Sequence, residues 1–89
     1  MGRYEIDLLA RDGSVIVVVE VRARGRGARV RALDSIDSAK RARLRRAAEW
    51  LWRDRFAKDP RLERVRFDCV AVTFDEADEP VVEYVRAAF

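Results

Sequence analysis

The sequence predicts a small α/β domain in which a mixed sheet of about four strands, a hairpin first, packs against one long helix. Three segments predict it. Residues 15–21 are almost all β-branched, apolar residues recur at helical spacing between 37 and 58, and residues 64–74 form a second strand-like segment with an apolar run at 67–74. Because 89 residues can enclose only one hydrophobic core, we expect a single domain spanning residues 1–89.

The first two strands are predicted to form a hairpin around Asp12-Gly13. Residues 5–10 alternate in polarity, the Asp-Gly dipeptide is typical of a two-residue turn, and the strand at 15–21 follows it. If Asp12 and Gly13 fill the two turn positions, Arg11 pairs with Ser14.

Counting outward from that turn gathers three carboxylates at the open end of the hairpin. Glu5 would lie opposite Glu20, and Asp7 diagonal to Glu20 on the same face, within about 7–8 Å. Such like charges repel unless a hard cation such as Mg²⁺ lies among them, or unless that end is hydrated and neutralised by Arg3 and Arg22. Spacing alone leaves both interpretations open.

The middle of the chain is predicted to hold a basic loop at 23–33 and then the long helix. Asp37 can cap a helix that continues to about Lys58, with Pro60 closing the segment. Its apolar stripe would comprise Leu44, Ala47, Ala48, Leu51 and Trp52. Trp50 cannot share a helical face with Trp52, so we expect one of them in the core and the other partly exposed.

The last third of the chain is predicted to add two strands. Residues 64–74 form the third, in which Cys69 is expected to be a small buried hydrophobe. A polar turn at 75–80 leads to a fourth strand at 81–85, at an edge of the sheet.

Positive charge is concentrated in one quarter of the chain. Ten basic and two acidic residues lie between Arg22 and Arg46, a net charge of +8 in a chain whose total is +3. Such a block favours a polyanionic partner, since basic side chains displace counterions from nucleic-acid phosphates; the alternative is a hydrated face of an Arg-rich protein. The expected contacts with nucleic acid, DNA in particular, are Arg22, Arg24, Arg26, Arg29, Arg31, Lys40, Arg41, Arg43 and Arg45.

The composition and the sequence pattern exclude several kinds of site and segment. The chain has no histidine and one cysteine, which excludes the usual zinc sites and an internal disulfide. Its first residues lack the pattern of a signal peptide, and no apolar run approaches the 18 or so residues that cross a bilayer. We therefore expect a cytoplasmic protein with no membrane partner.

The hairpin segments resemble a known family. Residues 4–13 read YEIDLLARDG and residues 18–24 read VVEVRAR, which is similar to the patterns GEIDLIARDG and FVEVKTR of the YraN family. That family has the Holliday-junction-resolvase-like, restriction-endonuclease-like nuclease fold. Further similarity to its helix and last strands covers nearly the whole chain, at Lys40, Leu44, Ala47-Ala48, residues 66–68, residues 70–72 and Ala88-Phe89.

The resemblance implies a catalytic site. In nucleases of this fold an Asp on one strand and the Glu of a Glu-x-Lys motif on the next bind Mg²⁺ (or Mn²⁺), and the Lys helps to position or activate the attacking water. By position these roles fall on Asp7, Glu20 and Arg22, with Glu5 as a third acid for the metal. Arg22 replaces the Lys; its guanidinium can grip a phosphate but cannot act as a base. Lys40 could replace the missing ammonium, or simply contact a phosphate.

The resemblance also bears on assembly. Members of the family usually have an N-terminal helix and a first strand before this hairpin, and we expect the domain at 1–89 to lack both. The strand at 3–10 would then form a sheet edge, which a second copy can cover. We therefore expect a homodimer.

Two functions follow from these observations. The first is a nuclease-fold DNA-binding protein with Mg²⁺-dependent endonuclease activity on branched or duplex DNA. The alternative is a catalytically inactive nucleic-acid-binding or assembly module of the same fold. A third, weaker interpretation is a protein-interaction domain whose basic face meets an acidic partner.

Overall fold

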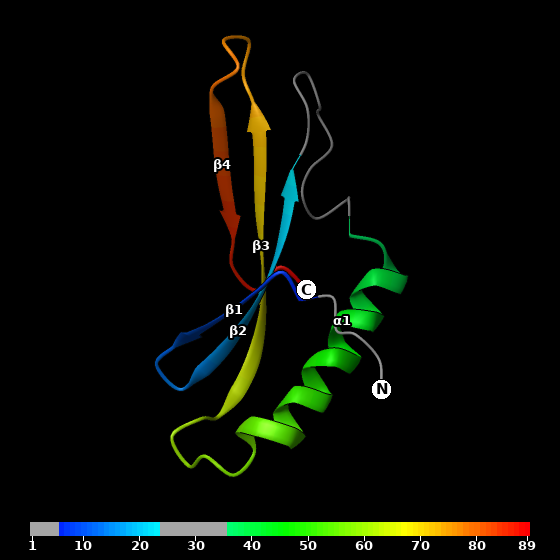
Figure 1. Cartoon of the computed structure of the whole chain (residues 1–89), viewed down its shortest axis with the longest axis vertical. Helices are drawn as coiled ribbons and strands as arrows, with labels where there is room; N and C mark the ends of the chain where they lie inside the picture. The colour runs from blue at the N-terminus through cyan, green and yellow to red at the C-terminus, as the bar shows by residue number, and fades with distance from the viewer. Residues whose placement is uncertain (1–5, 24–35) are drawn as a thin grey trace.

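The computed structural model describes residues 6–23 and 36–89, in which a four-stranded sheet carries a helix on one face (Figure 1). The elements in chain order are β1 (Leu8–Asp12), β2 (Val15–Ala23), α1 (Ser38–Leu51), the π-helix η2 (Trp52–Phe56), β3 (Arg64–Phe74) and β4 (Pro80–Val85). The strand order is β1-β2-β3-β4, with β2 and β3 parallel and the outer pairs antiparallel. The predicted α/β class, mixed sheet, leading hairpin and single long helix are confirmed.

The hairpin turn differs from the prediction by one position. Gly13 and Ser14 form the turn, and Asp12 pairs with Val15, so the predicted pairing of Arg11 with Ser14 was wrong. Gly13 has φ +59°, whereas Ser14 does not have a positive φ, the pattern of a type II′ turn with glycine first. Asp12 stays in the strand, and every cross-strand pair shifts accordingly.

The parallel pairing of β2 with β3 fixes which side chains face α1. Glu20 lies opposite Cys69, and Val18 lies opposite Phe67, so these four share a face of the sheet. The buried apolar residues on this side come from β2, α1 and β3 and from the segment before the helix: Ile16, Val18, Ile36, Leu44, Ala47, Ala48 and Cys69. Cys69 is fully buried, as predicted.

Helix α1 begins as predicted and ends differently. Asp37 Oδ1 accepts a hydrogen bond from the Lys40 N–H at 2.8 Å, which is the expected N-cap. The α-helix was predicted to reach Lys58, but it ends at Leu51 and continues as η2, in which the Ala57 N–H donates to Trp52 O at 2.7 Å. The helical spacing of apolar side chains predicts a regular α-helix. It does not reveal a π-helical turn, which contains one residue more than an α-helical turn.

The last strands follow the prediction closely, whereas the tryptophans follow it only in part. Trp50 is partly exposed, as expected of one of the two, but Trp52 is half-buried and does not belong to the buried core. β3 spans the predicted range, and β4 begins one residue before its predicted start. After β4, Ala87 adopts a left-handed φ of +52°, and the Ala88 N–H donates to Phe67 O at 2.7 Å. This turn returns the C-terminus to the α1 side.

Among the described residues, no helix has the length and apolar character needed to span a bilayer.

Candidate metal and phosphate site

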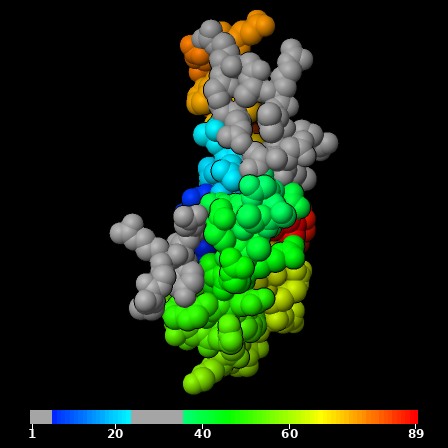
Figure 2. Space-filling model, turned by 90° about the vertical axis from the view of Figure 1, so that its right-hand side faces the viewer, coloured from blue at the N-terminus to red at the C-terminus, as the bar shows by residue number. Residues whose placement is uncertain are grey.

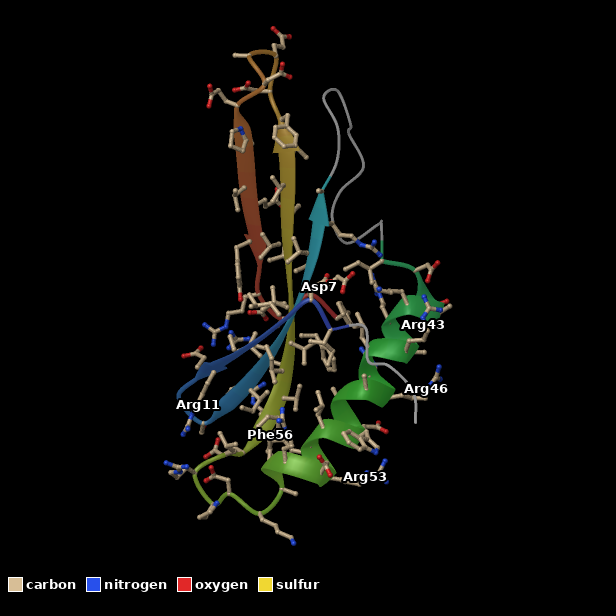
Figure 3. All side chains as sticks on the ribbon, in the orientation of Figure 1. Asp7, Arg11, Arg43, Arg46, Arg53 and Phe56 are labelled. Carbon is tan, nitrogen blue, oxygen red and sulfur yellow. The ribbon has the colours of Figure 1, made fainter. Side chains whose placement is uncertain are left out.

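Two carboxylates lie opposite each other at the end of the hairpin away from its turn, where Figure 3 labels Asp7. Asp7, just before β1, accepts a hydrogen bond on Oδ2 from the Val21 N–H at 3.0 Å. Because Leu8 pairs with Val19, the same register places Asp7 opposite Glu20. The predicted diagonal arrangement was therefore wrong, and the corrected turn brings the two acids closer than expected.

Glu20 is a buried acid beside two cations. Its side chain is 2% exposed, and its Oε1 lies 3.6 Å from Lys40 Nζ and 3.7 Å from Arg22 Nε. Its Oε2 is buried and accepts no hydrogen bond from any residue the structure describes. Burial raises the pKa of Glu20, as does the neighbouring Asp7 carboxylate, and the attraction of Lys40 and Arg22 only partly opposes this.

The two cations come from different elements. Arg22 lies two positions after Glu20 on β2, so both side chains point to the α1 face. Lys40 is the third residue of α1, and the Asp37 cap fixes where that helix starts. The structure places the Lys40 ammonium beside the Glu20 carboxylate.

Two other predicted phosphate contacts pack over aromatic rings. Arg41 donates through Nε to Ile36 O at 2.9 Å, and its guanidinium carbon lies 5.5 Å from the centre of the Phe89 ring. The guanidinium carbon of Arg45 lies 6.0 Å from the ring centre of Phe67. Both side chains therefore help to hold α1 against β3 and the C-terminus.

The remaining predicted contacts are either exposed or outside the described residues. Arg43 projects from the side of α1 away from the sheet, as does Arg46 (Figure 3). The predictions for Glu5, Arg24, Arg26, Arg29 and Arg31 lie outside the described residues.

The chemistry of the acid pair fits a hard divalent cation. Within residues 6–23 and 36–89, no group of three or more acidic or cysteine side chains could hold a metal ion, so a cation at Asp7 and Glu20 would have only these two acids of the described residues as ligands. Mg²⁺ is commonly held by one or two carboxylates, with waters and substrate phosphate completing its shell. The buried Glu20 Oε2, with no hydrogen-bond donor among the described residues, is the kind of oxygen that such a cation satisfies.

The sequence analysis missed an ion network on the other face of the sheet. Arg66 donates to both oxygens of Asp68, at 2.9 and 3.0 Å, and to Asp12 Oδ2 at 3.1 Å. Asp68 also accepts from the Tyr84 hydroxyl and from the Ala87 N–H. Burial alone would raise the pKa of Asp68, but these hydrogen bonds outweigh it and lower the pKa. Alternating charges inside an otherwise apolar strand were the available signal.

This network fixes the framework of the site. It joins β3 to the hairpin through Asp12 and to the end of β4 through Tyr84, on the face away from the acid pair. It therefore holds in place the strands that carry Asp7 and Glu20.

Comparisons with known proteins identify the family. A sequence model described as "Uncharacterised protein family UPF0102" matches residues 1–72. The chain is similar to UPF0102 protein sce2912 of Sorangium cellulosum, with 57% identity over 89 residues, which is all of this chain and 62% of that protein. It is 39% identical to a UPF0102 protein of Acidothermus cellulolyticus, covering 96% of this chain and 70% of the relative. A UPF0102 protein of Pseudomonas aeruginosa is 42% identical, covering 98% and 69%. The chain thus spans about three-fifths of its relative from Sorangium. As the resemblance of its hairpin to YraN predicted, the chain belongs to the UPF0102 family.

Proposed function

We propose that this chain is a DNA-binding domain with a restriction-endonuclease-like core, in which Asp7 and Glu20 hold Mg²⁺ or Mn²⁺ and Arg22 and Lys40 hold the adjacent phosphate. One observation carries the proposal. The opposed acids lie beside two cationic groups, each within 4 Å of the same buried oxygen, Glu20 Oε1. The resemblance to nucleases with an Asp and a Glu-x-Lys motif supports the same assignment.

Each side chain has a distinct task in this proposal. Asp7 and Glu20 provide the oxygens for the cation. The Arg22 guanidinium can grip a phosphate through two hydrogen bonds. In the Glu-x-Lys motif, the lysine two positions after the Glu supplies an ammonium. Here Lys40 supplies that ammonium from α1. When bound, a divalent cation would stabilise charge on the phosphate and make a nearby water more acidic.

A second function is favoured by Arg22 itself. A guanidinium in the position of the motif's lysine cannot accept a proton from water. The same domain would then serve as a catalytically inactive nucleic-acid-binding or assembly module, in which the basic side chains still bind phosphates. The chain covers only part of the length of its relatives, so any activity of a longer protein that contains this domain is also a proposal.

Cleavage of supercoiled plasmid and of a four-way junction, with and without Mg²⁺, tests the proposal. We expect weak, metal-dependent nicking that Asp7→Asn and Glu20→Gln abolish and that Arg22→Lys increases. Glu76→Gln and Arg55→Lys are matched controls, because both residues are exposed and lie on other elements. DNA binding without nicking by either the natural chain or Arg22→Lys would establish the inactive module, and absence of DNA binding would refute both functions.

A further inference from the structure

An open groove lies between the second half of α1 and β3. Its volume is about 770 Å³, within the range of small-molecule sites. Seen from the helix side, β3 and the C-terminus lie along one flank of α1 (Figure 2). The residues that line the groove include the aromatic Trp52, Phe67 and Phe89 and the basic Arg45 and Arg53.

The groove adjoins the acid pair on the same face of the sheet. Phe67 lies two residues before Cys69, the partner of Glu20 on β3, which separates them by about 6–7 Å along the strand. On the helix, Lys40 and Arg45 are separated by about 7–8 Å along the axis. A ligand whose phosphate lies at Lys40 can therefore extend into the groove over a short distance.

Trp52 is the ring that suits stacking by a ligand. Phe67 is already stacked by Phe89, with ring centres 5.1 Å apart and planes 27° apart, and Arg45 lies over it. Phe56, by contrast, meets the Trp52 indole at 54°, which is a tilted contact and not a stack. Trp52 is also the first residue of the π-helix, a form of turn often found at functional sites.

The polar groups of the groove match the parts of a nucleotide. Arg53, in η2 (Figure 3), offers a guanidinium for phosphate oxygens. Glu49 and Glu63 also line the groove; Glu63 Oε2 accepts a hydrogen bond from the Ser14 hydroxyl at 3.1 Å, and the Glu49 carboxylate can accept hydrogen bonds from the amino group of a base. An aromatic floor with both kinds of charge around it fits a base with its phosphate better than it fits a purely apolar ligand.

We propose that this groove binds an unpaired nucleobase, stacked on Trp52, while a neighbouring phosphate of the same strand lies at Lys40 and Arg22. The inference rests on the proposed function for the identification of the ligand as nucleic acid, and it names the substrate class. A base held in a duplex cannot enter, so single-stranded or branched nucleic acid binds in preference to continuous duplex.

The two tryptophans provide a matched test. Trp50→Phe leaves Trp52 as the only tryptophan, and Trp52→Phe leaves Trp50, which does not line the groove. Each variant is titrated, without divalent metal, with a short thymidine strand, with an abasic strand of equal length and with a blunt duplex. We expect the thymidine strand alone to quench Trp52, and none of the three to quench Trp50. Trp52→Ala should weaken binding of the thymidine strand by about 5- to 100-fold and leave the abasic strand unaffected.

The outcomes separate this inference from the proposed function. Equal affinity for the thymidine and abasic strands, with no selective quenching of Trp52, would overturn the groove and leave the metal and phosphate site standing. Selective quenching of Trp52 in a chain that shows no response to Mg²⁺ would support the groove and remove the metal site. If neither strand binds, both proposals are wrong.

Discussion

Lys40 Nζ lies 3.6 Å from Glu20 Oε1, so the first turn of α1 brings an ammonium to a carboxylate buried in β2. The contact depends on the cap at Asp37, which sets the start of the helix and thereby the height of Lys40 above the sheet. Glu20 nevertheless has a raised pKa, because burial and the Asp7 carboxylate oppose its charge more strongly than Lys40 and Arg22 favour it. Because the folded chain disfavours the charge of Glu20, changes of pH, of this side chain and of bound metal should each alter the stability of the fold.

Glu20 should destabilise the chain at neutral pH. Its pKa is near 4.5 in the unfolded chain and higher in the folded one, so the folded state binds the proton more tightly. Its contribution is therefore most favourable below pH 4.5 and declines as pH rises through the raised folded pKa. Glu20→Gln should raise stability at neutral pH and remove this slope, which urea unfolding between acid and neutral pH measures. An identical slope in Glu20→Gln and in the control Glu76→Gln would contradict the effect.

A divalent cation should raise the melting temperature. Asp7 and Glu20 are set opposite each other only in the folded chain, so Mg²⁺ or Mn²⁺ binds that state preferentially, with a gain of about 2.7 kcal/mol at a hundredfold excess over Kd. The combined change of Asp7→Asn and Glu20→Gln should stabilise the metal-free chain and erase the response. If calorimetry with millimolar Mg²⁺ and Mn²⁺ leaves natural and mutant melting curves equally unmoved, the acids are a hydrated hairpin end and the metal site does not exist.

Affinity for DNA should fall steeply with salt and depend little on sequence. If five to eight phosphates are neutralised, the log–log slope is about −4 to −7. Changing Arg22 and Lys40 together to Gln should make the slope shallower by about 2, since each phosphate contact contributes roughly 0.9. Arg55 and Lys58, exposed at the far end of the helical segment, give the matched pair of substitutions. Equal effects from the two pairs would show that the attraction reflects net charge alone.

The Arg66–Asp68 pair should be essential for folding stability. Asp68→Asn leaves the buried Arg66 charge with only the exposed Asp12 as its acidic partner and should cost up to about 3–5 kcal/mol in urea unfolding. The milder Tyr84→Phe removes one hydrogen bond and should cost roughly 0.5–1.5 kcal/mol. Because the folded pKa of Asp68 is lowered from 3.8, its stabilisation is complete above that pH and is lost as pH falls through the folded value. Unchanged stability in both variants would contradict the role given to this network.

The chain should form a homodimer through β1, an edge strand of the described sheet. Leu8 on this strand is 53% exposed, and a second copy could cover it while burying about 1,200 Å² or more in total. Leu8→Glu should then shift the population to monomer in light scattering, whereas Val82→Glu, on the opposite edge strand β4, should not. A stable monomer of the natural chain at micromolar concentration would defeat the prediction.

The elements were predictable where local pattern decides them. The largely apolar sequence of β3 and the Asp37 cap are local signals, and both were predicted at the right residues. The hairpin turn was displaced because Asp12 is a common turn residue, yet here it is held in the strand by Arg66, a partner far away in sequence. The π-helix at Trp52 adds a residue to a turn, which side-chain periodicity does not reveal.

The site was predictable in part. Asp7, Glu20 and Arg22 followed from the family resemblance, and the structure brings Asp7 and Arg22 to Glu20. The placement of Lys40 required the packing of α1 on the sheet, which depends on contacts between distant segments. The alternating charges of β3 hint at the pairing of Arg66 with Asp68, but the burial of that face of the sheet depends on the hairpin and β4.

The turn at Gly13 and Ser14 sets which residues of β1 and β2 lie opposite each other. Side chains on a strand alternate between faces, so one residue added to β1 would rotate Asp7 to the opposite side of the sheet. The turn lies about 17–20 Å along the strand from Asp7. Inserting one residue near this turn, far from the acids, would therefore separate Asp7 from Glu20 although neither residue is changed.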